Sequence, residues 1–202
     1  MSFARPLFLR VRSAISSVSP SSFGLSLVAL VAVAGCGDPV APPPQAAYFV
    51  SFLHPGVDCE IASHQMKLGD VSAMDRKAVV ADGYGGADIS CTVSGSGAFK
   101  VSDTTALDKG RSLTLDIPSI SKNAKQATPA RGFVAYASEK TVDTYTPDPM
   151  TPCNFFFADG SAEGVAAGKI WVQFDCPVVI AEASTCAMNG TALFENCATG
   201  TE

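Results

Sequence analysis

Catalytic and metal-binding motifs are scarce in this chain. Its 202 residues include only two histidines and one tryptophan, and 16% of them are charged. The sequence lacks the H-E-x-x-H zinc motif and the G-x-S-x-G nucleophile elbow, because Gly160–Gly164 carries its serine directly after the first glycine. It also lacks a C-x-x-C pair, which argues against a zinc ribbon, a haem attachment site and a thioredoxin-like redox centre. The sequence therefore predicts no catalytic residue and no enzyme activity.

Positive charge is sparse as well. The chain has 14 basic and 19 acidic residues, and a formal net charge of −5. Three of the basic residues and none of the acidic ones lie in the first 35 positions, so the remainder carries a net charge of about −8. It offers no cluster of lysine and arginine that would contact phosphate groups. These observations exclude nucleic acid as an expected partner.

The N-terminal region has no apolar run long enough to cross a bilayer, whose hydrocarbon core is about 30 Å thick. Arg5, Arg10 and Arg12 instead precede a short apolar run of 12 residues, Phe23–Ala34. A positive segment followed by a short apolar run is typical of an export signal. The sequence thus predicts that residues 1–35 are a signal peptide that is removed on export.

The residues at the end of this signal resemble the lipobox of bacterial lipoproteins. The motif is Val33-Ala34-Gly35-Cys36, in which the cysteine is acylated and the chain is cut on its N-terminal side. The alternative is ordinary secretion with cleavage after Ala34, which leaves Cys36 as a free thiol. In the lipobox interpretation, the two or three acyl chains on Cys36 hold the protein stably at a membrane. By analogy with enterobacterial sorting, Gly37 in place of aspartate implies the outer membrane.

The lipobox also sets the domain organisation. Residues 36–45 are the lipidated cysteine and a proline-rich tether, and residues 46–202 form a single domain that is long enough for a hydrophobic core.

Apart from Cys36 the chain has an even number of cysteines, which in an exported domain predicts disulfides. Many pairings are open, and the sequence favours Cys186 with Cys197 because Asn189-Gly190 between them suits a hairpin turn. The six cysteines are Cys59, Cys91, Cys153, Cys176, Cys186 and Cys197.

Short segments that alternate between apolar and polar residues dominate the domain. Alternation with a period of two indicates half-buried antiparallel strands, and it places Cys91, Cys153 and Cys176 toward the core, where a bridge would join sheet to sheet. A short helix is expected only within Met66–Ala81. The pattern predicts an all-β fold, either an antiparallel β-sandwich or a Greek-key barrel of about eight strands, stapled by disulfides. The expected strands are 47–53, 89–94, 97–102, 112–117, 132–138, 153–158, 169–176 and 191–197.

One strand face is a candidate binding site. Trp171 is out of phase with the apolar residues of its strand, so it shares a face with Lys169, Gln173 and Asp175 that we expect to be exposed. An aromatic ring among hydrogen-bonding groups is typical of sheets that bind sugars or peptides, and tryptophan is enriched at binding hot spots. The alternative is that a loop covers Trp171 on the second side of the sheet.

A second candidate is a metal site in the segment 82–88. Asp82 and Asp88 flank three glycines there, and carboxylate and carbonyl oxygens on a flexible loop are the ligands that Ca²⁺ prefers. The segment lacks the spacing of an EF-hand, so an ordinary glycine-rich loop is the alternative. No other cofactor is expected.

The lipobox, the tether and the six-cysteine β domain, which closes with Phe194-Glu195-Asn196-Cys197, together resemble uncharacterised bacterial lipoproteins. The resemblance implies an exported protein that is lipid-anchored at the outer membrane, and it implies no activity. We therefore expect a non-catalytic envelope protein that binds a protein or a glycan at the membrane surface. The alternatives are a structural envelope component and a hydrolase that uses carboxylates, which would need two of them close together with separated pKa values.

Overall fold

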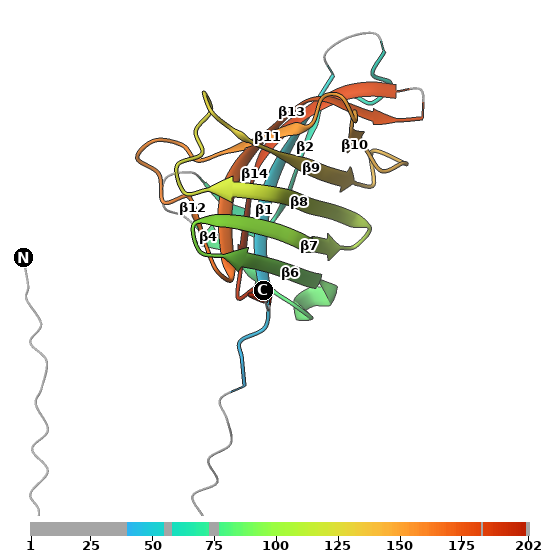
Figure 1. The fold of residues 1–202 in the computed structure, drawn as a ribbon. Helices are drawn as coiled ribbons and strands as arrows, with labels where there is room; N and C mark the ends of the chain where they lie inside the picture. The colour runs from blue at the N-terminus through green and yellow to red at the C-terminus, as the bar shows by residue number, and fades with distance from the viewer. Residues whose placement is uncertain (1–39, 55–57, 73–76, 183, 201–202) are drawn as a thin grey trace, which may run out of the picture. The chain divides into compact units, whose positions relative to one another are not determined.

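Antiparallel β-strands make up most of the computed structural model (Figure 1), which describes residues 40–54, 58–72, 77–182 and 184–200. These residues belong to a compact unit that spans Val40–Glu202. The predictions for residues 1–35, Cys36 and Gly37 lie outside the described residues. Within the described part, no helix is long and apolar enough to cross a membrane. The strands are β1 (Gln45–Leu53), β2 (His64–Leu68), β3 (Asp70–Val71), β4 (Lys77–Ala78), β5 (Val80–Ala81), β6 (Asp88–Gly95), β7 (Ala98–Asp108), β8 (Arg111–Ser121), β9 (Ala130–Ala137), β10 (Thr146–Pro147), β11 (Cys153–Phe156), β12 (Gly164–Ala166), β13 (Lys169–Ala181) and β14 (Ser184–Glu195).

One sheet carries nearly all of these strands, in the order β2-β1-β14-β13-β11-β9-β8-β7-β6, with β5, β10 and β12 paired at its margins. Its long strands follow the predicted alternation: Ile170, Val172 and Phe174 are buried, and each is paired directly with a residue of β14. The all-β, antiparallel prediction is therefore confirmed. The only helical element among the described residues is a short 3-10 helix, η1 (Tyr84–Gly86).

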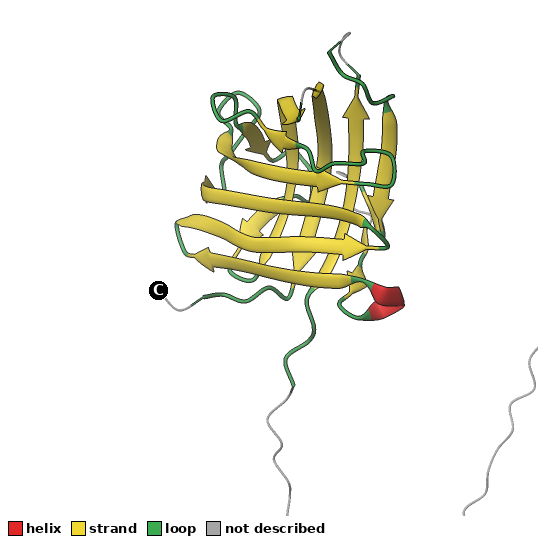
Figure 2. Ribbon diagram, turned by 90° about the vertical axis from the view of Figure 1, so that its right-hand side faces the viewer, coloured by secondary structure: helices red, strands yellow, loops and turns green. Residues whose placement is uncertain are grey.

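The sheet curls so that its two halves lie over each other. Figures 1 and 2 show β6, β7, β8 and β9 running across one side of the domain, while β1, β13 and β14 run up the other side. The core fills the space between these two layers. Its largest side chains include Tyr48, Phe52, Phe155, Phe174 and Phe194, each less than 2% exposed. Burial of one such ring stabilises the fold by roughly 1.5 to 3 kcal/mol, so the core between the two layers supplies much of the hydrophobic stabilisation.

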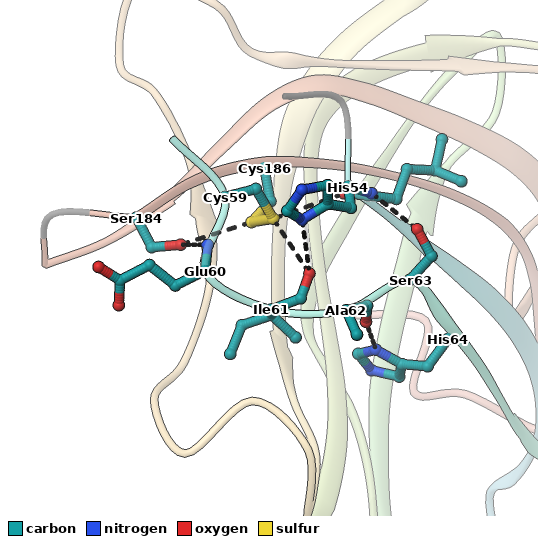
Figure 3. Close-up of a disulfide and its surroundings, with 10 residues drawn as sticks. His54, Cys59, Glu60, Ile61, Ala62, Ser63, His64, Ser184 and Cys186 are labelled. Atoms are coloured by element: carbon teal, nitrogen blue, oxygen red, sulfur yellow. Dashed lines mark hydrogen bonds between the residues drawn. A yellow bond between two sulfur atoms is a disulfide. The ribbon is translucent and has the colours of Figure 1, made fainter. Parts of the chain in front are cut away.

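Three disulfides tie the layers and edges together, which confirms the predicted bonding of all six cysteines. Cys153–Cys176 joins the neighbouring strands β11 and β13, and Cys91–Cys197 joins β6 to the segment after β14. Cys59–Cys186 joins the loop before β2 to β14 (Figure 3). Beside it, the Glu60 amide donates to the hydroxyl of Ser184 at 3.1 Å, and His54 Nδ1 lies 3.1 Å from the Ile61 carbonyl.

The predicted pairing of Cys186 with Cys197 is wrong. Asn189-Gly190 is not a turn but lies inside β14, where both residues pair with β13 and with β1. Glycine is required there because an added Cβ would lie 2.7 Å from Cζ of Phe174 and against the carbonyl oxygen of Phe49. The bridge Cys153–Cys176 also differs from expectation, since it links adjacent strands of one sheet and not two facing layers.

The predicted helix within Met66–Ala81 is also wrong. Wherever this segment is described it forms strands or their connections, and β2 pairs with β1 from Tyr48↔Leu68 to Phe52↔His64. The strands β3 and β4 pair with each other as a separate two-stranded sheet. Tertiary pairing with β1 therefore overrides a local pattern that would also suit one or two helical turns.

Candidate functional site

The outer face of the layer β2-β1-β14-β13-β11, which points away from the core, carries the best candidate site. Directly paired residues of antiparallel strands present their side chains on the same face. The pairing therefore arranges this face in three rows, each crossing several strands. We call them the polar row (Asn154, Asp175, Asn189, Ser51, Gln65), the mixed row (Phe156, Gln173, Thr191, Phe49, Lys67) and the apolar row (Trp171, Leu193, Ala47).

A groove of about 340 Å³ lies over the polar and mixed rows. We call it the amide groove, because amide side chains from three separate segments reach it. Besides the backbone of Gly190 and the edge of Phe174, its lining consists of Phe49, Gln126, Phe156, Gln173, Asp175, Asn189 and Thr191. Its volume is within the range of roughly 300 to 1,000 Å³ that is usual for small-molecule sites.

Most of the polar side chains in the amide groove have no partner within the protein. In the described part of the chain, Asp175, Asn189, Gln126 and Thr191 make no side-chain hydrogen bond to another residue. Gln173 is held in place, because its Nε2 donates to Oε1 of Glu163 at 3.0 Å. The groove therefore presents several free donors and acceptors together with one oriented amide.

The alternation of β13 predicts one shared face for Lys169, Trp171, Gln173 and Asp175, and the strand pairing puts all four on the outer face. Gln173 and Asp175 line the amide groove. Lys169 instead forms an ion pair with Glu195, with 2.8 Å between Nζ and Oε1.

Trp171 does not have the exposure that its position in the strand predicts. Its side chain is 3% exposed and packs with Leu193, Ala47 and Val71 of the β3–β4 hairpin, with Phe49 and Val79 partly buried against them. The alternative interpretation, in which Trp171 is covered on the second side of the sheet, is the correct one. Its indole nitrogen is buried without a hydrogen-bond partner.

The candidate calcium segment is an exposed loop around η1. Asp82 uses its Oδ1 to accept a hydrogen bond from the amide of Ile89 at 2.8 Å, which closes the loop onto the start of β6. Asp88 is exposed at the first position of that strand. Among the described residues, no three His, Cys, Asp or Glu side chains are placed to hold a metal together. Calcium binding at this loop stays a prediction without geometric support.

A buried polar network that the sequence did not reveal surrounds His64. The Nδ1 atom of His64 lies 2.9 Å from the Ala62 carbonyl, which only accepts, so Nδ1 is the donor of this hydrogen bond. The hydroxyl of Tyr136 lies 3.1 Å from Nε2, and the hydroxyl of Ser138 lies 3.4 Å from it. A serine beside a histidine resembles a nucleophile and its base, but Ser138 and His64 are only 6% and 7% exposed. The network satisfies polar groups inside the core.

Tyr48 carries the second unusual polar group of the core. Its side chain is 1% exposed, and its hydroxyl is buried without a hydrogen-bond partner. Burial raises the pKa of Tyr48 to about 12, and the nearby Tyr136 and Asp108 act in the same direction, while Arg111 lowers it. The phenol is therefore neutral over the whole physiological range and contributes packing.

A larger groove of about 520 Å³ lies where the 146–152 segment approaches β8 and β9. Its walls are mainly apolar, with Phe133 and several prolines, and we call it the proline groove. Asp116, Arg131 and Asp148 are its charged residues. Arg131 is also the cross-strand neighbour of Asn154, so the polar row leads from the amide groove toward the proline groove.

No protein-family model matches the chain, and neither a curated protein nor a solved structure is significantly similar to it.

Proposed function

We propose that this chain is a non-catalytic, lipid-anchored protein of the bacterial cell envelope that binds a partner through the amide groove. In this proposal the signal peptide directs export, Cys36 carries the lipid, and the proline-rich tether separates the domain from the membrane. The single observation that carries the binding role is the set of polar side chains in the groove that have no partner among the described residues. Such groups are available to a ligand without first breaking internal hydrogen bonds.

The location outside the cytoplasm is supported by the cysteines. All six cysteines of the described residues form disulfides, and such bonds persist in oxidising compartments. The disulfide-rich β domain is consistent with an extracellular location. Lipid anchoring and the outer membrane rest on Val33-Ala34-Gly35-Cys36 and on Gly37.

A cell fractionation experiment tests the anchor. The wild-type chain is expected in the outer-membrane fraction and in the detergent phase of a phase separation. Cys36→Ala should move the protein to the soluble fraction or leave it uncleaved. Gly37→Asp is the matched control, because it keeps the cysteine and, by the sorting analogy, should retain the lipidated protein in the inner membrane. Identical fractionation of the wild type and Cys36→Ala would contradict the proposal.

A carboxylate-dependent hydrolase is the second candidate, and one observation favours it. Asp116 and Asp148 line the proline groove together. Acid–base hydrolysis needs two carboxyl groups in different environments, so that one stays protonated while the other is ionised. Asp148 Oδ1 already accepts a hydrogen bond from the Met150 amide at 2.8 Å, and Asp116 is exposed. The binding role therefore has the better geometric support.

A further inference from the structure

The amide groove is formed by strands whose backbone groups are already paired. β1 lies between β2 and β14, β14 lies between β1 and β13, and β13 lies between β14 and β11. An extended peptide that adds to a sheet needs an edge with free backbone N–H and C=O groups. The groove offers no such edge, so its ligand is bound by side chains alone.

The polar side chains of the groove suit a ligand with many hydroxyl groups. Asn189 and Gln126 each offer a carbonyl oxygen and an NH₂ group, and Thr191 offers a hydroxyl, so these three can both donate and accept. Asp175 adds a carboxylate that accepts only, and Gln173 keeps its Oε1 free after its NH₂ group binds Glu163. A hydroxyl group is itself both donor and acceptor, so it can pair with any of them.

The charge of the groove argues against an anionic ligand. Of the described residues that line the groove, only Asp175 is ionisable, and the chain after position 35 carries a net charge of about −8. A phosphate or uronate group would meet this carboxylate and find no lining cation to pair with it. The ligand that fits is therefore neutral.

Two phenylalanine rings lie in the mixed row on either side of Gln173 and Thr191, and the exposed Lys67 continues the row beyond Phe49. Phe156 on β11 and Phe49 on β1 are separated by β13 and β14. With neighbouring strands about 4.8 Å apart, the backbones of Phe49 and Phe156 are about 14 Å apart across the sheet. Phe49 is only half-buried, so part of its ring is available to pack against apolar C–H groups of a ligand. A groove with polar groups in the middle and apolar rings at both ends suits an elongated ligand.

From these observations we propose that the amide groove binds a neutral oligosaccharide. Asp175, Asn189 and Gln173 bind its hydroxyl groups, and Phe49 packs against the C–H face of a sugar ring. This inference rests on the proposed function, since it identifies the partner as a glycan. A protein partner is the competing outcome of the test.

Titration of the mature lipidated protein against defined oligosaccharides tests the inference. The protein is held in a detergent without a sugar head group, which would itself compete for the groove. The probes are neutral glucan, mannan and galactan oligomers of about two to six units, which match the 14 Å span estimated from the strand spacing. Uronate oligomers of the same lengths and a set of extended peptides serve as competing classes. Calorimetry measures the affinity, and side-chain amide NMR signals show whether the ligand lies in the groove.

At least one neutral series is expected to bind and to shift the amide signals of Asn189 and Gln173. Asp175→Ala and Asn189→Ala should each weaken this binding at least tenfold. The matched controls Asp116→Ala, in the proline groove, and Asn123→Ala, on an exposed loop, should leave it unchanged. Thermal unfolding of all four variants checks that the fold is retained, and mapping the NMR shifts on the wild type needs no variant.

Three results would overturn the inference. One is the absence of binding by every neutral oligomer at millimolar concentration, and another is binding that Asp175→Ala and Asn189→Ala leave intact. The third is a preference for uronates or peptides over neutral oligomers. The groove would then still be a binding site, but its ligand would not be a neutral oligosaccharide. Failure of the lipid anchor is detected separately, by the fractionation of Cys36→Ala.

Discussion

Removal of the disulfide Cys91–Cys197 should destabilise the domain more than removal of Cys153–Cys176. The first bond closes a separation of 106 residues and holds the end of the chain against β6, which is an edge strand of the sheet. The second closes 23 residues between strands that also pair through their backbones. We compare Cys91→Ala/Cys197→Ala with Cys153→Ala/Cys176→Ala. Both bonds are buried, so the two double variants lose similar packing.

The expected difference in the free energy of unfolding between the two double variants follows from chain entropy and from the backbone hydrogen bonds at the edge strand β6. Because Cys59–Cys186 stays intact, the unfolded chain connects Cys91 to Cys197 through about 43 residues, and the loop-closure relation then gives about 4.0 kcal/mol for this bond, against about 3.4 kcal/mol for Cys153–Cys176. The segment at Cys197 also makes backbone bonds that depend on its position: the Val93 amide donates to the Ala198 carbonyl at 2.8 Å, and the Ala198 amide donates to the Cys91 carbonyl at 2.9 Å. Each such bond contributes roughly 0.5 to 1.5 kcal/mol. We therefore expect the Cys91–Cys197 bond to contribute about 1.5 to 3.5 kcal/mol more to the free energy of unfolding than the Cys153–Cys176 bond.

Urea unfolding of the two double variants at one pH measures this difference. Hydrogen exchange gives a local readout, because the amides of Val93 and Ala198 should lose protection in Cys91→Ala/Cys197→Ala and keep it in the other variant. An equal or smaller loss of stability in Cys91→Ala/Cys197→Ala, with both amides still protected, would refute the role assigned to the C-terminal segment.

Three further substitutions test the packing of the two faces. Gly190→Ala places a Cβ 2.7 Å from the Phe174 ring, and we expect a loss of about 1 to 3 kcal/mol in urea unfolding; full stability would show that β14 has room there. Tyr48→Phe removes a hydroxyl without a partner, so at pH 7 it should be neutral or stabilising. With a pKa of about 12 in the folded protein and about 10 in the unfolded chain, the wild type loses stability as the pH rises from about 10 to 12. The unfolded chain releases its proton first in that window. Tyr48→Phe should reduce this fall of the unfolding free energy with pH. An unchanged pH dependence would show that burial does not raise the pKa of Tyr48. Trp171→Phe removes an indole N–H that has no partner among the described residues, but it also leaves a small cavity, so we expect a loss of about 1 to 3 kcal/mol in the free energy of unfolding. A loss as large as the roughly 3 to 5 kcal/mol expected for truncation to alanine would contradict the assignment of Trp171 to packing alone.

The strands could be predicted because their signal is local. In β13 and β6, apolar and polar residues alternate with a period of two, and that alternation decides which side chains reach the core. The same rule placed Trp171 correctly on the outer face. Its burial could not be predicted, because the β3–β4 hairpin that covers it lies about 100 residues earlier in the chain.

The features that were missed depend on contacts between distant residues. The disulfide partners Cys59 and Cys186 are 127 residues apart, and no local pattern identifies such a pair. Asn189-Gly190 has the composition of a hairpin turn, yet cross-strand pairing with β1 and β13 and the ring of Phe174 hold it in the middle of β14. Two lining residues of the amide groove, Gln173 and Asp175, could be predicted from the sequence, whereas Asn189 and Gln126 come from segments that only the fold brings beside them.

Acylation of Cys36 underlies the proposed membrane location, and metabolic labelling with palmitate tests it. Cells that express the wild-type chain should incorporate the label into it, and the mature protein should begin at an acylated Cys36. Cells that express Cys36→Ala should produce an unlabelled chain. Label that persists in Cys36→Ala, or a wild-type N-terminus at Gly35 followed by an unmodified Cys36, would contradict the account.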